Sequence, residues 1–202
     1  MYQRYFKRAL DVLISLLALV VLSPVLALLA VAIKLDSKGP VLFSQKRYGR
    51  DQRLFHIYKF RTMRVDTPHD VPTNDLRDPH SYITRLGGFL RKSSLDELPQ
   101  LWNILKGDMS LIGPRPALWN QYDLMALRRQ HGADAIRPGL SGWAQVNGRD
   151  ELGEDLERKA QLDGEYARNI TFGFDVKCLL LTVLRVLDHR GVVEGAQREE
   201  SK

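Results

Sequence analysis

The chain has 202 residues, a length that suits one domain with its own hydrophobic core. Its one cysteine, Cys178, excludes an internal disulfide, fits a reducing compartment and reads as a small core residue. The net charge of +6 favours an anionic partner, which could be nucleic acid, an acidic membrane surface or a phosphorylated substrate.

The first element is an apolar stretch, residues 12–33, in which no residue is charged, 15 are Leu, Ile or Val and 4 are Ala. At ~0.4 kcal/mol for each strongly apolar residue, burial in a bilayer is worth ~6 kcal/mol. Pro24 inside a helix costs only ~3 kcal/mol. We therefore expect a membrane-inserted helix that bends at Pro24, with the Ser23 hydroxyl bonding the carbonyl of Val20 that the proline leaves free.

Basic residues flank both ends of this stretch. Three precede it and five follow it: Arg4, Lys7, Arg8, Lys34, Lys38, Lys46, Arg47 and Arg50. By the positive-inside rule both ends are cytoplasmic, which favours a re-entrant helix. An ordinary span with a proline kink is the alternative, because membrane helices tolerate proline.

Turn residues and hydrophobic periodicity divide the rest of the chain. We expect, in order, a β-hairpin with strands over 41–46 and 54–60 and a turn at 49–51, a surface loop over 64–81, helices over 82–92, 95–107 and 117–131, an irregular glycine-rich segment over 137–149, and helices over 151–168 and 174–187. Arg128 and Arg129 are expected on the exposed side of their helix, and the last helix on a membrane surface or in the core. The fold class is α+β and mostly helical, with surface amphipathic helices.

The adjacent acids Asp96 and Glu97 are the first candidates for chemistry. Pro99 lacks an N–H and fits the first turn of a helix, which places both acids at a helix N-terminus. With Arg91 just upstream, the pair could hold Mg²⁺ against a phosphate, and a carboxylate could also attack phosphorus. The structural alternative is a capping box made by Ser94 and Glu97.

Other polar residues could bind a phosphate or a nucleotide. Arg115 has a stiff backbone between Pro114 and Pro116, and its guanidinium could clamp a phosphate. The remaining candidates lie at the end of the hairpin and in the glycine-rich segment, whose open backbone could approach a nucleotide closely: Lys59, Arg61, Arg137, Gln145, Asn147 and Arg149. The sequence lacks Walker A, G-x-G-x-x-G and H-E-x-x-H motifs, and its five histidines are scattered, which argues against zinc.

Five blocks of the sequence, in order, resemble the bacterial sugar transferase family, the monotopic polyprenyl-phosphate phosphoglycosyl transferases. The blocks are FKRALDVLISLLALVVLSPVLALLAVAIKL, GPVLFSQKRYG, FHIYKFRTM, SLDELPQLWNILKGDMSLIGPRP and RPGLSGWAQVNGRD. They cover the chain from about residue 5 to about residue 190, and it looks like the minimal catalytic domain of the family.

The resemblance implies an activity and roles for these residues. The family transfers a sugar 1-phosphate from a UDP-sugar to polyprenyl (undecaprenyl) phosphate and releases UMP, through a phosphosugar bound to an aspartate, with Mg²⁺. Asp96 would be the nucleophile, with Glu97 assisting it or the metal, and Arg91 would bind a phosphate. Pro114, Arg115 and Pro116 match the nucleotide-side motif, and Ser23 with Pro24 matches the bend of a re-entrant helix.

The resemblance also implies an organisation. Residues 1–36 would form the re-entrant membrane helix, 37–192 a catalytic domain on the cytoplasmic face of the bacterial inner membrane, and 193–202 a flexible tail. The product would initiate capsule, O-antigen or glycoprotein glycans. Expected partners are membrane lipid, the two substrates, a second copy of the chain and downstream glycosyltransferases, and no nucleic acid.

Three other functions fit parts of the sequence. A membrane-attached, metal-dependent pyrophosphate hydrolase could use the same two acids, but it would not need a lipid phosphate acceptor. A non-enzymatic basic membrane scaffold would tolerate a charge-neutral substitution of Asp96. A membrane-anchored nucleic-acid binder would need interleaved aromatic and basic residues, which the sequence lacks.

Overall fold

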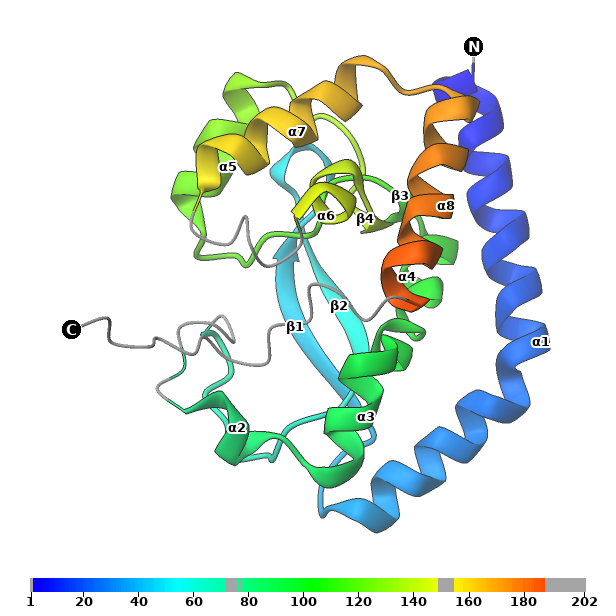
Figure 1. Cartoon of the computed structure of the whole chain (residues 1–202), viewed down its shortest axis with the longest axis vertical. Coiled ribbons are helices and arrows are strands. Elements are labelled where there is room, and N and C mark those ends of the chain that lie inside the picture. Colours follow the sequence, from blue (N-terminus) through cyan, green and yellow to red (C-terminus); the bar gives the residue numbers. More distant parts are fainter. Residues whose placement is uncertain (1, 72–75, 77, 149–154, 188–202) are drawn as a thin grey trace.

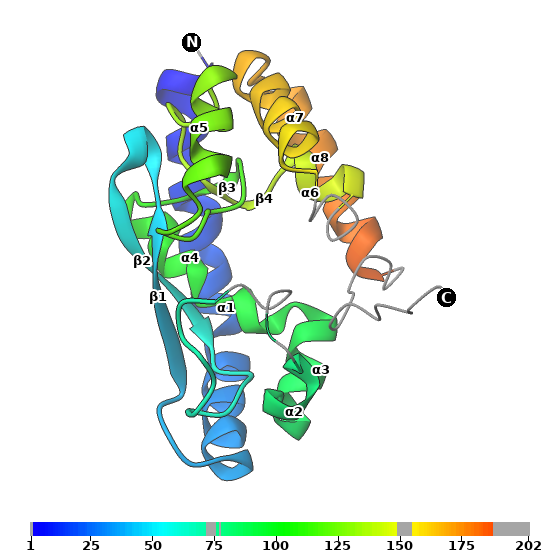
Figure 2. The same ribbon diagram turned by 90° about the vertical axis from the view of Figure 1, so that its left-hand side faces the viewer.

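The computed structural model describes residues 2–71, 76, 78–148 and 155–187. Helices predominate around two small two-stranded sheets (Figure 1, Figure 2), which confirms the α+β class. The elements are a π turn (Tyr2–Phe6), α1 (Lys7–Asp36), β1 (Leu42–Tyr48), a 3₁₀ turn η2 (Arg50–Gln52), β2 (Leu54–Phe60), α2 (Pro79–Tyr82), α3 (Arg85–Ser93), a 3₁₀ turn η4 (Leu95–Glu97), α4 (Gln100–Lys106), β3 (Ser110–Ile112), α5 (Tyr122–Gln130), β4 (Gly139–Ser141), α6 (Trp143–Gly148), α7 (Leu156–Arg168) and α8 (Phe172–Leu187).

Helix α1 runs along one side of the molecule and changes direction about halfway along its length (Figure 1). Pro24 lies inside it, and the Ser23 hydroxyl donates to the carbonyl of Val20 at 2.8 Å, as the sequence predicted. The helix is long and apolar enough to cross a membrane, and only 6% of its most apolar part is buried. A core helix would be mostly buried, so this exposed apolar surface is consistent with a membrane location.

One face of α1 packs on the rest of the protein. Its inner residues contact two apolar clusters that lie under the hairpin and under α3 and α4. The hairpin is antiparallel, with its register running from Leu42 opposite Phe60 to Tyr48 opposite Leu54. The fully buried Asn103 joins α4 to β2, because its amide oxygen accepts from the backbone of Tyr58 at 3.0 Å. The turn η4, just before α4, is thereby held beside β2.

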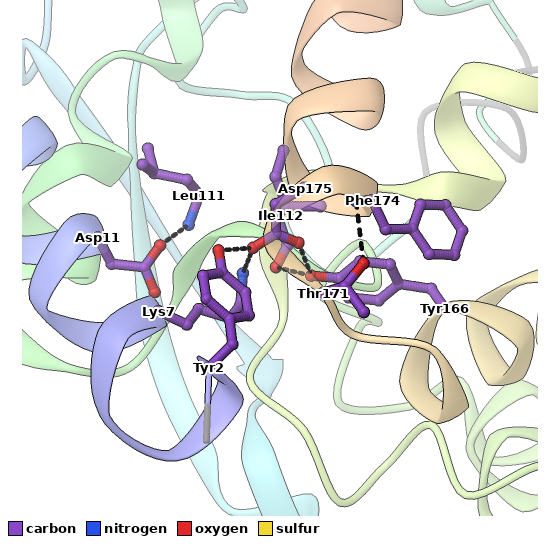
Figure 3. A network of polar contacts seen from close by, with 9 residues as sticks. All are labelled: Tyr2, Lys7, Asp11, Leu111, Ile112, Tyr166, Thr171, Phe174 and Asp175. Carbon is purple, nitrogen blue, oxygen red and sulfur yellow. Dashed lines mark hydrogen bonds and ion pairs between the residues drawn. The ribbon is translucent and has the colours of Figure 1, made fainter.

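A polar network fastens the first turns of α1 to α8 (Figure 3). The Asp175 carboxylate accepts hydrogen bonds from Tyr2 (2.6 Å), from Lys7 (2.7 Å) and from the hydroxyl of Tyr166 (2.5 Å). One turn further along α1, Asp11 accepts from the backbone of β3 at 3.0 Å. The buried polar face of an otherwise apolar helix therefore serves to anchor it to the domain.

The glycine-rich segment 137–149 is not irregular, contrary to the prediction. It contains β4, which pairs in parallel with β3, and helix α6. A β-carbon on Gly139 would lie 2.1 Å from the backbone nitrogen of Gly113, and one on Gly142 would lie 2.1 Å from the oxygen of Gly113. These glycines bring two backbones together, and nucleotide binding by this segment stays a prediction.

The exposed position predicted for Arg128 is also wrong. Arg128 is 3% exposed and forms a buried ion pair with Asp163 of α7, with 2.6 Å between Nη2 and Oδ2. Arg129 is exposed, as predicted. In α8 the thiol of Cys178 is fully buried, which confirms a core residue, and burial raises its pKa to about 12. The other side of α8 leaves leucine and valine residues exposed.

Candidate active site

Asp96 and Glu97 lie in the turn η4, between α3 and α4. Ser94 reverses the chain in the left-handed conformation (φ 56°), and Pro99 separates η4 from α4. The capping-box alternative is wrong, because the Ser94 side chain makes no capping hydrogen bond. Both acids are nearly buried, at 8% and 9% exposed. Buried acids in a sharp turn need charged partners or lose their charge, so their surroundings define the site.

Two cations from distant parts of the chain converge on Glu97. Lys59, on β2, places its Nζ 2.8 Å from Oε1 of Glu97. Arg115 places its Nη2 3.1 Å from the same oxygen. Burial lowers the pKa of Lys59, while Glu97 raises it. The structure thus brings together three of the residues that the sequence singled out, from β2, η4 and the segment after β3.

The Asp96 carboxylate makes no hydrogen bond within the part of the chain that the structure describes. Burial raises its pKa; the nearby charge of Lys59 opposes that rise, and Glu97 adds to it. Arg91 and Arg115 also favour the ionised form. An ionised carboxylate here keeps its lone pairs unshared next to several cations, which is the condition for a nucleophile that must attack an anionic group.

A cavity of about 470 Å³ opens onto Asp96. It lies between the hairpin, the segment 62–71 and α3. The cations that line it in the described part of the chain are Arg47, Lys59, Arg61, Arg64 and Arg91. A cavity rich in guanidinium groups suits phosphate oxygens. A larger cavity of about 590 Å³ near the N-terminal end of α1 includes neither acid of η4, so size alone would misplace the site.

Arg47 is a site residue that the sequence patterns did not indicate, where it counted only as a charge flanking the apolar stretch. Its Nη2 donates to Gln45 (2.6 Å) and its Nη1 to the carbonyl of Pro116 (3.0 Å). Burial, with a smaller effect of Arg115, lowers its pKa to about 10, and Glu97 opposes the change. The hairpin held a signal for it. Residues two apart on a strand share a face, so Phe43, Gln45 and Arg47 lie on one face of β1. Because Phe43 pairs with Lys59, Arg47 lies on the same face as Lys59.

The segment Pro114–Arg115–Pro116 is held by hydrogen bonds to all three of its carbonyl groups. Arg47 donates to that of Pro116, Arg128 to that of Arg115 at 2.9 Å, and the backbone of Gly139 to that of Pro114 at 2.9 Å. The buried Arg128 therefore fixes the position from which Arg115 reaches Glu97.

The other predicted binding residues have different settings. Arg61 lines the cavity, but its guanidinium donates to Ser37 and to the carbonyl of Pro40, so it anchors the chain that follows α1. Gln145 lines a smaller groove on the other side of Glu97. Asn147 is exposed and donates to the carbonyl of Trp143, while Arg149 lies outside the described residues. Substrate binding by these four stays a prediction.

The two acids also bear on the predicted Mg²⁺. Among the residues with described positions, no group of three or more His, Cys, Asp or Glu side chains could hold a metal. Mg²⁺ is commonly held by one or two carboxylates together with substrate phosphates and water. Neither oxygen of Asp96 is hydrogen-bonded to a described residue, and Glu97 uses Oε1 for Lys59 and Arg115, so this pair fits that arrangement.

The fold and the site define a membrane-associated protein in which a buried acid faces a cavity lined by basic side chains. The chain belongs to the bacterial sugar transferase family, whose model matches residues 2–189, and this confirms the resemblance seen in the sequence. It is 42% identical over 192 residues to an undecaprenyl-phosphate glucose phosphotransferase of Komagataeibacter xylinus, covering 91% of this chain and 36% of that protein.

Two further relatives show how the match varies in extent. The UDP-glucose:undecaprenyl-phosphate glucose-1-phosphate transferase of Escherichia coli K12 is 42% identical over 189 residues, which cover 90% of this chain and 40% of that protein. An uncharacterized sugar transferase of Bacillus subtilis, EpsL, is 39% identical over 186 residues, which cover 92% of this chain and 89% of EpsL. The chain thus spans less than half of the two named transferases and most of EpsL.

Proposed function

We propose that this protein transfers a sugar 1-phosphate from a UDP-sugar to polyprenyl phosphate and releases UMP. The observation that carries the proposal is the buried Asp96 carboxylate, which has no hydrogen bond in the described chain and faces a cavity lined by Arg47, Lys59 and Arg91. Family membership and the names of the transferases that match support the same reaction.

In the first step an oxygen of Asp96 attacks the phosphorus that carries the sugar. The bond from that phosphorus to the oxygen bridging the two phosphates breaks, and UMP leaves with the bonding electron pair. The product on the protein is an aspartyl phosphosugar. Phosphoryl transfer depends mainly on positioning and on charge neutralisation, which Lys59, Arg91 and Arg115 can supply around this carboxylate.

In the second step an oxygen of polyprenyl phosphate attacks the same phosphorus. The bond to Asp96 breaks, the carboxylate is restored, and the product is a polyprenyl diphosphate sugar. A covalent intermediate suits two bulky substrates of opposite polarity, because each can use the one site in turn. Asp96 and Glu97 would hold Mg²⁺, whose chemistry when bound is to neutralise charge on the diphosphate oxygens.

We further propose that α1 is re-entrant and that the domain lies on the cytoplasmic face of the inner membrane. Pro24 inside the helix, the change of direction of α1 (Figure 1) and the basic residues at both of its ends support this topology. The acceptor's phosphate lies at the membrane surface, so a helix that enters and returns would hold η4 at the depth of that phosphate. Initiation of a surface glycan would follow from the product, and a homodimer and downstream glycosyltransferases remain predicted partners.

The covalent intermediate provides the test. Purified protein with Mg²⁺ is incubated with each of a panel of UDP-sugars in the absence of acceptor, and intact mass and peptide mapping are recorded. We expect one equivalent of UMP and a sugar-phosphate adduct on Asp96 with the correct sugar. Continued release of free sugar phosphate without acceptor would identify the hydrolase instead. Turnover with lipid acceptor but no adduct at any time would contradict the nucleophile.

A further inference from the structure

A second, smaller groove begins at the other acid of η4. Asp96 lines the basic cavity, whereas Glu97 lines a groove of about 190 Å³ between η4, β4, α6 and α8. Its walls are mainly apolar, with Leu98, Leu140, Leu179 and Val186 among them, and Arg185 stands at its rim. Apart from Glu97, the donor chemistry proposed above uses none of these residues.

We infer that this groove binds the first isoprene units of the polyprenyl phosphate acceptor, with Arg185 contacting the acceptor's phosphate. The inference rests on the proposed function and names where the second substrate binds. A lipid phosphate needs an apolar channel that starts beside the reacting carboxylate, and this groove shares the turn η4 with Asp96. The two substrates would then reach one carboxylate from two sides.

The size of the groove limits how much of the acceptor's lipid chain it can bind. A volume of about 190 Å³ corresponds to roughly six water molecules in the liquid, which is room for one or two five-carbon units and not for a long polyprenyl chain. Beyond the groove, α8 exposes Leu180 and Leu184, which are 60% and 61% exposed. The rest of the lipid chain would leave over this apolar surface toward the membrane.

The charges at the rim fit a phosphate. Arg185 is exposed and makes no hydrogen bond or ion pair within residues 2–71, 76, 78–148 and 155–187. Glu97 lines the same groove, but Lys59 and Arg115 already neutralise its charge. The rim therefore offers a positive charge next to an apolar channel, which matches an anionic head on an isoprene chain.

Adjacent residues of α8 supply a matched pair of variants. Leu179 lines the groove and is 46% exposed, whereas Leu180 is 60% exposed and lies outside it. Neither is buried, so tryptophan at either position is compatible with folding. We expect Leu179→Trp to raise the KM for undecaprenyl phosphate at least tenfold by filling the groove, while Leu180→Trp changes it less than twofold.

The donor half-reaction separates this inference from the proposed function. UMP release and adduct formation without acceptor should be the same in wild type and in both tryptophan variants. Failure of wild type to release UMP would contradict the proposed function itself. A normal half-reaction with an unchanged acceptor KM in Leu179→Trp would overturn the groove alone.

Arg185→Gln gives a second measurement that does not depend on filling the groove. We expect it to raise the acceptor KM at least tenfold and to leave the half-reaction unchanged. The control is Arg129→Gln, an exposed arginine of α5 that does not line the groove. Equal acceptor KM values for these two variants would exclude Arg185 as the phosphate contact.

Discussion

Asp175, at the start of α8, and Asp96, in η4, are 9% and 8% exposed, and yet their carboxylates differ in their hydrogen bonding. Three side chains donate to Asp175: Tyr2, Lys7 and Tyr166 (Figure 3). Asp96 receives no hydrogen bond from any residue that the structure describes. Two carboxylates of equal burial therefore differ in whether their lone pairs are already shared.

This difference in hydrogen bonding indicates which of the two acids can react as a nucleophile. A carboxylate whose oxygens all accept hydrogen bonds is stabilised and holds its neighbours in place, but it is a poor nucleophile. Burial, and then the neighbouring Asp175, raises the pKa of Tyr166, so this tyrosine stays a hydrogen-bond donor. At Asp96 burial raises the pKa of the acid itself, and nearby cations rather than hydrogen bonds oppose that rise. Burial alone would not have separated an anchor from a nucleophile.

The largest expected effect is that of Asp96→Asn on turnover. Without the attacking oxygen, UMP release should fall by at least about 10³-fold. Stability should stay equal or rise, because a group whose pKa is raised by folding destabilises the folded protein when it is ionised at neutral pH. Initial rates and thermal unfolding in the same detergent measure both. Turnover at the wild-type rate would remove the distinction between the two acids.

Asp175→Asn should give the reverse pattern. It leaves the buried ammonium of Lys7 without its partner, which costs about 3–5 kcal/mol of unfolding free energy. Turnover per folded molecule should stay within a few-fold of wild type, because Asp175 does not line the cavity at Asp96. Denaturant titration and active-site counting measure the two quantities. Unchanged stability with lost turnover would place Asp175 in the chemistry.

Lys59→Gln tests the role of the cations around Asp96 through the pH dependence of the rate. The reaction needs ionised Asp96, so the rate falls as pH falls through its raised pKa. Because Lys59 favours the ionised form, its loss should raise that pKa further and move the acid limb to higher pH. The rate on that limb should drop by about 10²-fold. The control is Lys46→Gln, an exposed lysine of the same hairpin, whose pH–rate profile should match wild type.

The smallest effect concerns the bend of α1. Pro24→Ala should straighten the helix, but the Asp175 network should still hold the first turns of α1 against the domain. We expect a cysteine placed at position 3 to stay cytoplasmic in Pro24→Ala. A fraction should cross to the far side when Asp175→Asn is added. Maleimide labelling of intact and permeabilised cells measures that fraction. Complete relocation in Pro24→Ala alone would show that the network does not hold the N-terminus.

Local patterns predicted the features that local chemistry determines. The apolar helix with its break, the hairpin, the helix that ends at Gly107 and the acids before Pro99 all follow from neighbouring residues. Arg128 could not be placed this way, because its partner Asp163 is 35 residues away. Arg128 lies on the same face of α5 as Leu124 and Met125, which are buried. An arginine is rarely buried without a paired acid, so it was predicted to be exposed while Asp163 was not known to be near.

The prediction of an irregular structure for the glycine-rich segment was wrong for a related reason. Its glycines suggested an open surface, whereas Gly139 and Gly142 lie against the backbone of Gly113, which is distant in the sequence. Ser94 misled because a serine before an acid is typical of a cap, and its positive φ is set by the reversal between two helices. The alternation of side chains along the hairpin places Arg47 on the same face as Lys59, but its contact with Pro116 is long-range and could not be predicted.

The seclusion of Cys178 has a practical consequence for spectroscopy and topology mapping. With a thiol pKa of about 12, roughly one molecule in 10⁴ or fewer carries the reactive thiolate at pH 8. Dyes and spin labels that react with thiols will therefore not modify Cys178. A single introduced cysteine reports its own position, and the natural sequence needs no preliminary removal of thiols.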